Sequence, residues 1–237
     1  MKPKVLAGVL WRKIVPPRCA NYRGRLAAFR GAGLEIGGPS GAFRSWGILP
    51  VYPFAERVDN CVFTRNTVWK RGNDRYFIAE ATRLDFAADA SYDFVLSSQM
   101  LEHSANPLKA LKEWHRVLKR DGTLFITVPD RRFTFDHRRQ VTPFAHLVED
   151  YEADRGEDDL THLAEILALH DLGREPRAMT LEEFKTRSEK NAENRCLHQH
   201  VFDRDTLALA LEWAGFKVQN VEEVGPHHVA AQALAAA

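Results

Sequence analysis

Short apolar runs and amphipathic stretches alternate along most of this chain. The run Tyr92–Ser98 is apolar through its middle, which is typical of a strand buried on both faces. Seven segments have strand-like patterns: 34–36, 57–62, 75–80, 92–98, 123–129, 217–224 and 227–235. The alternation predicts an α/β fold: a Rossmann-like, doubly wound, seven-stranded sheet whose last strand is antiparallel to its neighbour.

Helix signals lie between several of these runs. Asn106 is a favourable N-cap and Pro107 suits the first turn of a helix that Asp121-Gly122 would end. A later helix is predicted over 203–215, where a glycine closes the pattern.

Residues 131–199 interrupt the alternation. They are rich in charge and histidine, and they show helical patches near 143–152, 159–169 and 180–193. A segment of this length is too long for a simple connection. We therefore expect an inserted helical cap between the fifth strand and the last helix, which would bind the substrate.

Charge divides the chain unevenly. The net charge is +1, yet residues 1–33 contain eight Lys or Arg and no acid. We expect a basic N-terminal arm or helix over 1–33, with the main domain formed by 34–130 and 200–237. Such an arm can bind nucleic acid or an anionic membrane, although a solvated helix that covers a domain edge fits it better.

Cellular location is indicated only indirectly. The three cysteines lack metal-finger spacing and fit free thiols in a reducing cytoplasm. Neither a secretory signal nor a membrane-spanning apolar run is predicted.

The stretch Gly33–Phe43, "GLEIGGPSGAF", places an acid and then flexible residues at the end of a predicted buried strand. Such a turn lets a ligand approach the backbone, and its acid suits a cationic ligand. Asp59 follows on the next strand, where it could accept hydrogen bonds from ribose hydroxyls. The dinucleotide fingerprint fails because Pro39 and Ala42 replace its second and third glycines, which disfavours a nicotinamide dehydrogenase.

Longer blocks carry a family resemblance. "LEIGGPSG", "IAEATRLDF", the segment Ala90–Asp130 with its "LEH", and "LALEWAGFKV" resemble the class I S-adenosylmethionine-dependent methyltransferases. The resemblance implies a cofactor site. The loop would hold the methionine moiety with Glu35, Gly37, Gly38, Ser40 and Gly41, and Asp59 would hold the ribose. Glu80 and Ala81 would meet the adenine, and the sulfonium would lie beside Ser97, Ser98 and Gln99.

The chain departs from the family pattern after Gly41. Gly47, Pro50 and Pro53 exclude a long first helix, so a short helix or a loop is expected there. That segment, with its aromatic residues, would either line the substrate mouth or plug the sheet.

Several histidines suggest a metal or a base. Related small-RNA 2′-O-methyltransferases and ubiquinone-pathway O-methyltransferases bind a divalent ion through E-x-x-E-H, whose first acid is Gln99 here. The candidate ligands are Glu102, His103, His198 and His200, a set that suits Zn²⁺, Mn²⁺ or Fe²⁺ better than Mg²⁺. In the alternative, the site holds no metal, Glu102 fixes a helix start, and the general base is His103, His200 or His137.

Two further patterns contain acidic residues. The run Glu149–Asp159 fits a solvated helix face better than a metal cluster, and "LHD", Leu169–Asp171, resembles an oriented His–Asp pair. Together these features predict a biosynthetic S-adenosylmethionine-dependent methyltransferase that acts on the oxygen of a small molecule such as a sugar, a phenol or a natural-product intermediate. An RNA or nucleotide methyltransferase and a non-catalytic ligand-binding protein are the alternatives, and a homo-oligomer is compatible with either.

Overall fold

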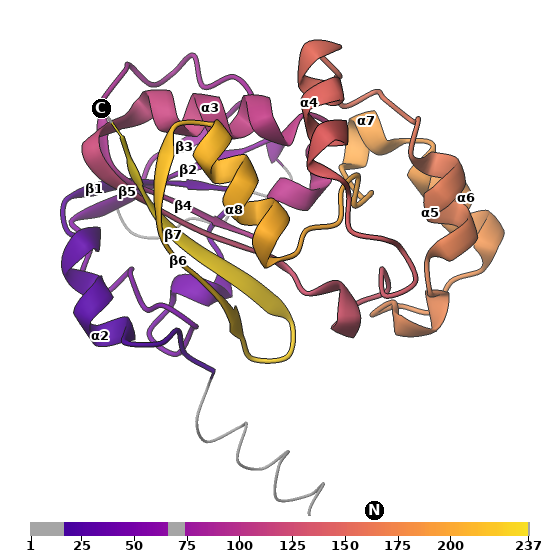
Figure 1. Cartoon of the computed structure of the whole chain (residues 1–237), viewed down its shortest axis with the longest axis horizontal. Helices are drawn as coiled ribbons and strands as arrows, with labels where there is room; N and C mark the ends of the chain where they lie inside the picture. The colour runs from indigo at the N-terminus through magenta and orange to yellow at the C-terminus, as the bar shows by residue number, and fades with distance from the viewer. Residues whose placement is uncertain (1–16, 66–73, 237) are drawn as a thin grey trace, which may run out of the picture.

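The structure, a computed structural model, describes residues 17–65 and 74–236. Within these residues seven strands form one sheet in the order β3-β2-β1-β4-β5-β7-β6 (Figure 1). The strands are β1 (Ala32–Ile36), β2 (Arg57–Val62), β3 (Tyr76–Ile78), β4 (Tyr92–Ser98), β5 (Leu118–Pro129), β6 (Phe216–Val224) and β7 (His228–Ala235). Strand β7 is antiparallel to both neighbours and the remaining pairs are parallel. The predicted Rossmann-like sheet with an antiparallel last strand is confirmed.

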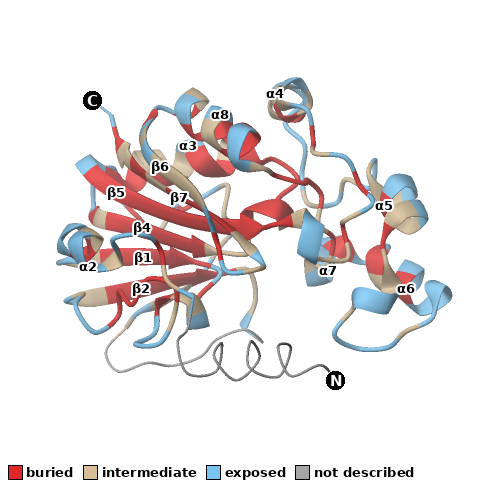
Figure 2. Cartoon of the chain, turned by 60° about the horizontal axis from the view of Figure 1, so that its bottom comes forward, coloured by how far each residue is buried: buried red, intermediate tan, exposed pale blue. Residues whose placement is uncertain are grey.

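Helices occupy the connections. They are α2 (Tyr22–Arg25), α3 (Pro107–Val117), α4 (Phe144–Glu152), α5 (Leu163–Leu169), α6 (Leu181–Ser188), α7 (Asn191–Asn194) and α8 (Arg204–Trp213). Helices α3 and α8 lie over one face of the sheet, whose strands are largely buried (Figure 2). Leu108, Leu111 and Trp114 of α3 are completely buried there, as the helical spacing of apolar residues predicts.

Irregular chain covers the other face of the sheet. After β1 a single 3-10 turn, Gly41–Phe43, replaces the first helix, which confirms the expected loop. Phe43, Leu49 and Val51 of this loop are fully buried against the strands. The loop therefore plugs the sheet, whereas its Trp46 is 65% exposed.

Helix α3 ends earlier than predicted. Its last residue is Val117, and Leu118 is already extended and paired with Tyr92 of β4. The Asp121-Gly122 stop was wrong because sheet pairing begins directly after the helix. Asp121 instead has a φ of 59° within the long β5 segment.

The cap region contains helices α4 to α7, beside the carboxyl ends of the central strands (Figure 1). The patch predicted at 159–169 is helical only from Leu163, and the patch at 180–193 divides into α6 and α7. Ile166, Phe184 and Leu197 form a small hydrophobic core within the cap region. The division into domains and the substrate role of 131–199 remain predictions.

Half of the basic residues of the predicted arm, Lys2, Lys4, Arg12 and Lys13, lie outside the described residues. Of the others, Arg25 forms a 2.6 Å ion pair with Glu222, and Arg18 donates to the Ser45 carbonyl. In the part of the chain that is described, no helix combines the length and apolar character needed to cross a membrane.

Candidate functional site

The glycine loop begins where β1 ends at Ile36. Gly37 has a φ of +80°, and a Cβ there would lie 2.9 Å from Cγ of Met100. Its amide donates to the Cys61 carbonyl at 2.8 Å, which fixes the loop against the end of β2. A larger residue would be strained at this position, so glycine keeps the backbone close to the carboxyl ends of the strands.

Glu35 is completely buried beneath this loop. Its Oε1 accepts from the Ser40 amide at 2.8 Å, and its Oε2 accepts from the Tyr52 hydroxyl at 2.5 Å. A Cβ on Gly38 would lie only 2.2 Å from the Glu35 carboxyl carbon. The acid therefore shapes the loop from inside, and its carboxylate does not face the neighbouring cavity.

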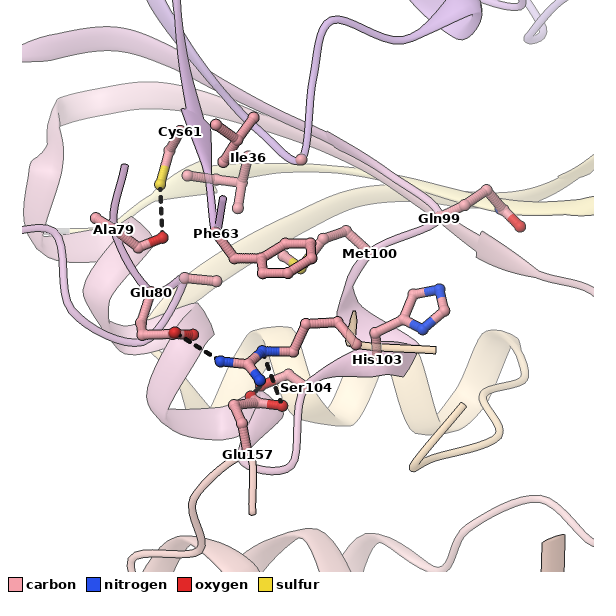
Figure 3. Close-up of a pocket in the computed structure, with 14 residues that line it drawn as sticks. Ile36, Cys61, Phe63, Ala79, Glu80, Gln99, Met100, His103, Ser104 and Glu157 are labelled. Carbon is pink, nitrogen blue, oxygen red and sulfur yellow. Dashed lines mark hydrogen bonds and ion pairs between the residues drawn. The ribbon is translucent and has the colours of Figure 1, made fainter. Parts of the chain in front are cut away.

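A cavity of about 220 Å³ lies beside the loop (Figure 3). The ends of β1 and β2, residues 79–81 after β3, four residues of the segment 99–104 after β4, and two cap residues line it. Its walls are mainly apolar, with Ile36, Cys61, Phe63 and Met100 among them. Of the expected cofactor residues it contains Gly37, Glu80, Ala81 and Gln99, whereas its lining lacks Glu35, Gly38, Ser40, Gly41, Asp59, Ser97 and Ser98.

Asp59 lies away from this cavity, contrary to the expectation of a ribose ligand. It sits in the middle of β2, paired with Leu34 of β1, and its side chain is fully buried. Arg75 binds it at 2.5 Å, and Arg57 lies 3.0 Å away. Its carboxylate pairs with these two partly exposed arginines, since the strand continues for three more residues before it reaches the loop.

Phe63, just beyond β2, lies in the cavity wall, whereas Asp59, the acid expected to bind the ribose, does not. The hydrogen bond from the Gly37 amide to the Cys61 carbonyl places the glycine loop beside Cys61. Phe63 follows Cys61 by two residues and lies in the cavity wall.

Glu80 meets a cap residue across the cavity. Its Oε1 lies 2.6 Å from Nη2 of Arg195, and Glu157 lies 3.8 Å from the same guanidinium. Figure 3 marks these ion pairs of Glu80 and Glu157 with dashed lines. Arg195 also stacks over Phe63, with 5.4 Å between guanidinium carbon and ring centroid. Sequence reasoning missed this arginine because no motif surrounds it.

The end of β4 brings three predicted residues near the cavity in different ways. Ser97 is buried, and its hydroxyl has no hydrogen-bond partner among the described residues. Ser98 accepts a hydrogen bond from Thr127 at 3.1 Å. Gln99 has a φ of 55° and contacts Nδ1 of His228 at 3.1 Å through its amide nitrogen. Of the three, only Gln99 is in the cavity wall.

A group of potential metal ligands adjoins this wall: Glu102, His103 and His198, hereafter the wall cluster. One ligand atom from each lies within 4.8 Å of the others. Glu102 is 1% exposed, and neither carboxylate oxygen has a hydrogen-bond partner in the described chain. Burial raises the pKa of Glu102 to about 7 and lowers the pKa of His103 to about 3.

The ring nitrogens of the wall cluster could hold a metal ion. Nδ1 of His103 lies 2.9 Å from the Leu197 carbonyl, so it carries the proton and Nε2 keeps its lone pair. Nδ1 of His198 lies 2.5 Å from Asp136, the arrangement that orients a metal-binding histidine. Two imidazoles and one orphaned carboxylate are a suitable donor set for a divalent transition metal.

Two other base candidates lie elsewhere. His200 is 1% exposed and contacts the Ser104 carbonyl and Asp150, so it is neither in the cavity wall nor in the wall cluster. His137 contacts Asp171 at 2.9 Å and is also absent from the lining.

The His and Asp of "LHD" have different partners. His170 is paired with Glu175 at 2.9 Å, whereas Asp171 binds His137, which is 34 residues away in sequence. The acid run 149–159 is also not uniformly solvated, because Asp150 is buried.

Comparisons relate this chain to known proteins by sequence and by fold. The protein family described as "Methyltransferase domain" matches residues 52–126. The uncharacterized protein MJ1123 of Methanocaldococcus jannaschii is 36% identical over 104 residues, which cover 43% of this chain and 46% of that protein. The match thus spans less than half the length of this relative.

Solved structures resemble the whole fold. An S-adenosylmethionine dependent methyltransferase from Mesorhizobium loti has a TM-score of 0.54 and 15% identity, with 91% of this chain and 96% of that chain covered. The methyltransferase in a complex with the Trm112 methyltransferase activator of Haloferax volcanii has a TM-score of 0.50 and 13% identity, covering 87% and 83% of the two chains. At these identities the likeness shows the shared fold.

Proposed function

We propose that the chain is a class I S-adenosylmethionine-dependent methyltransferase that methylates an oxygen of a small-molecule acceptor with the help of a divalent metal. The match of residues 52–126 to a methyltransferase domain and the shared fold support the methyltransferase part. The observation that carries the metal-assisted part is the wall cluster, where a buried carboxylate without a hydrogen bond adjoins two oriented histidines.

The cavity suits the nucleoside part of the cofactor. Phe63, Ile36 and Met100 offer apolar surface to a flat base, and residues 79–81 offer backbone groups and a carboxylate. Gly37 leaves room for a close approach along the backbone. Asp59 supplies nothing to the ribose, so the hydroxyls would be held by other groups. S-adenosylmethionine supplies a methyl group on a cationic sulfur, which the carboxylates near the cavity favour electrostatically.

The wall cluster would supply the acid–base chemistry. An acceptor hydroxyl must lose its proton as its oxygen takes the methyl group, and a divalent ion lowers the pKa of a bound hydroxyl. His103 lies both in the cavity wall and in this cluster, which brings a metal held there close to the cofactor cavity. The adjacent cap would select the acceptor.

The test combines binding with turnover. S-adenosylhomocysteine binding is measured by calorimetry, and methyl transfer from labelled S-adenosylmethionine is measured on sugar and phenol acceptors, after chelation and again after adding Mn²⁺ or Zn²⁺. We expect chelation to remove activity, the metal to restore it, and Glu102→Gln to abolish the restoration while S-adenosylhomocysteine still binds.

Other outcomes would overturn specific parts. Full activity after chelation would contradict the proposed role of the metal. Methylation of RNA alone, lost when residues 1–33 are removed, would favour the RNA methyltransferase. Cofactor binding without any methylated product from either acceptor class would favour a non-catalytic protein.

A further inference from the structure

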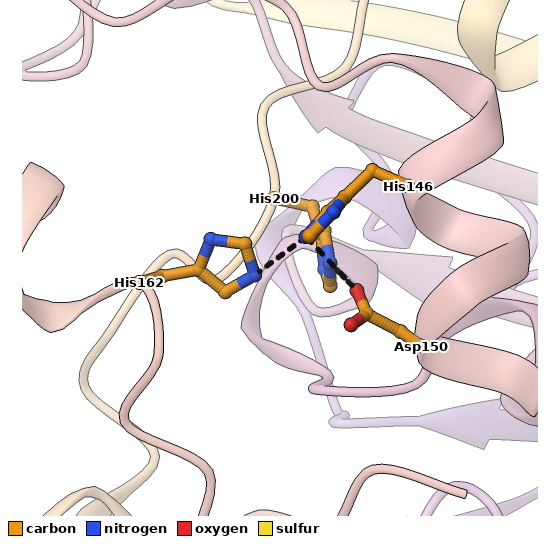
Figure 4. Close-up of side chains that lie close together, drawn as sticks. All are labelled: His146, Asp150, His162 and His200. Carbon is orange, nitrogen blue, oxygen red and sulfur yellow. Dashed lines mark hydrogen bonds and ion pairs between the residues drawn. The ribbon is translucent and has the colours of Figure 1, made fainter. Parts of the chain in front are cut away.

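A second group of metal-ligand side chains joins the cap to the main sheet. It consists of His146, Asp150, His162 and His200, hereafter the cap cluster (Figure 4). We propose that the cap cluster binds a Zn²⁺ ion that fastens the cap to the segment following β4. This site shares no side chain with the wall cluster.

Three separate parts of the chain supply the four residues. His146 and Asp150 are four residues apart on α4, so they lie on the same helical face. His162 is the N-cap residue of α5, and His200 lies on the extended segment that returns to α8. Figure 4 shows their side chains converging on one point.

The separations between the ligand atoms fit a tetrahedral ion. Nε2 of His146 lies 3.2 Å from Nε2 of His162 and 3.4 Å from Oδ2 of Asp150. Nε2 of His200 lies 2.9 Å from the same Oδ2. Zn²⁺ with bonds of about 2.0–2.1 Å requires ligand atoms roughly 3.3 Å apart at the corners of a tetrahedron. The remaining separations are all within 4.8 Å, so small side-chain shifts complete the geometry.

The positions of the protons also call for a cation. Nδ1 of His200 lies 3.0 Å from the Ser104 carbonyl and must donate to it, so in the neutral ring Nε2 keeps its lone pair. That lone pair then faces the Asp150 carboxylate. Nδ1 of His146 lies 3.3 Å from Glu149; in the tautomer that donates to Glu149, Nε2 keeps its lone pair and faces Asp150 and His162.

Protonating all three histidines would not resolve this conflict. The rings of His146 and His162 are 4.9 Å apart, and those of His162 and His200 are 5.1 Å apart, so their charges would repel. Of the carboxylates that face these rings, Asp150 is also approached by Arg155 at 3.8 Å, and Glu149 is 72% exposed on its side chain. One divalent ion would accept a lone pair from each of the three histidines and from the Asp150 carboxylate.

The donor set identifies the kind of metal and its role. Three imidazoles and one carboxylate suit Zn²⁺, whereas Mg²⁺ and Ca²⁺ prefer oxygen ligands. Four protein ligands would fill a tetrahedral ion, as in structural zinc sites, and leave no open position for a substrate. Asp150 is buried and His200 is completely buried, so the ion would be held mostly inside the protein.

Hydrogen bonds to the backbone would connect the ligands of this ion to the wall cluster. The His200 amide donates to the Glu102 carbonyl at 3.2 Å, and the Asn106 side chain donates to the Asp150 carbonyl at 3.1 Å. The cap cluster thus holds the segment that carries Glu102 and His103 against α4.

The experiment uses the full chain, stripped with chelator and titrated with Zn²⁺ or Co²⁺. Metal content is measured by atomic emission, and thermal stability is measured with and without Zn²⁺. We expect His162→Gln to lose one equivalent of Zn²⁺ and most of the Zn²⁺-dependent rise in Tm. His227→Gln, at an exposed histidine, should change neither value.

Two more variants make the result specific. His162→Cys should regain the equivalent and add a thiolate-to-metal absorption band with Co²⁺. Glu102→Gln should keep the Zn²⁺-dependent rise in Tm, which separates this site from the wall cluster. The proposal fails if the stripped chain takes up no Zn²⁺, or if His162→Gln binds as many equivalents with the same rise in Tm.

Discussion

The carboxylate of Asp59 contributes to the stability of the folded sheet through its pKa. Burial alone would raise its pKa, but hydrogen bonds from Arg75 and the charge of Arg57 outweigh this and hold the pKa of Asp59 below its ordinary value of 3.8. A carboxyl group with a depressed folded-state pKa contributes stability above its unfolded pKa, and that contribution is lost as the pH falls through the folded value.

We therefore expect Asp59→Asn to cost on the order of 2–3 kcal/mol in free energy of unfolding at pH 7. The difference from the parent should shrink steadily below pH of about 4, because the parent carboxylate then becomes protonated as well. Urea unfolding across this pH range measures it. Asp85→Asn, at an exposed carboxylate, is the control, and a cost independent of pH would contradict the interpretation.

Tyr52 supports the glycine loop through its hydroxyl. That hydroxyl donates to Glu35 at 2.5 Å and accepts from the Ser40 amide at 2.8 Å. Tyr52→Phe should destabilise the protein by about 1–3 kcal/mol, since it takes a hydrogen bond from a buried carboxylate. It should also weaken S-adenosylhomocysteine binding. Unfolding and calorimetry measure the two effects, and Tyr22→Phe, whose hydroxyl meets Arg23 at the surface, should show neither.

At the scale of elements, local pattern was sufficient for most of the fold. The bounds of β2 and β4 match their apolar runs, and Asn106 accepts from the Lys109 amide as the predicted N-cap of α3. These features depend on neighbours within a few residues. The end of α3 was mispredicted because pairing with β4, a contact distant in sequence, decided it.

The candidate site was only partly predictable for the same reason. Residue types and motif position indicated Gly37, Glu80 and the wall cluster. The partners of Asp59, Asp171 and His200 depend on which segments the cap brings together. Arg195 and Glu80 are 115 residues apart, and no periodicity relates residues at that distance.

The cap helices should respond as a unit to loss of their small core. Phe184 on α6 is 1% exposed and packs with Ile166 and Leu197. Phe184→Ala should cost about 3–5 kcal/mol, through lost burial and the cavity left behind. Hydrogen exchange should accelerate over 163–197 while β1, β4 and β5 stay protected. Leu181→Ala on the same helix is the control, because Leu181 is 56% exposed. Equal deprotection of the central strands would show that the cap does not open independently.

At the scale of the whole molecule, cap and sheet meet around the cavity. Arg195 and Glu157 come from the cap region, whereas Glu80 follows β3. Together they form a charged clasp across a cavity whose other walls are mainly apolar. A ligand that enters between β3 and the cap must displace or pass this clasp.

Arg195→Ala should therefore speed the association of S-adenosylhomocysteine. Glu80 is 46% exposed on its side chain, so the ion pair adds little to global stability, and the Tm should change only slightly. We expect an association rate several-fold higher by stopped-flow fluorescence. Raising the ionic strength should speed binding to the parent but not to the variant, since salt screens the clasp. Arg195→Lys retains the charge and should stay close to the parent. If Arg195→Ala binds more slowly, or if its affinity collapses with an unchanged association rate, Arg195 is a ligand-binding residue instead of a barrier.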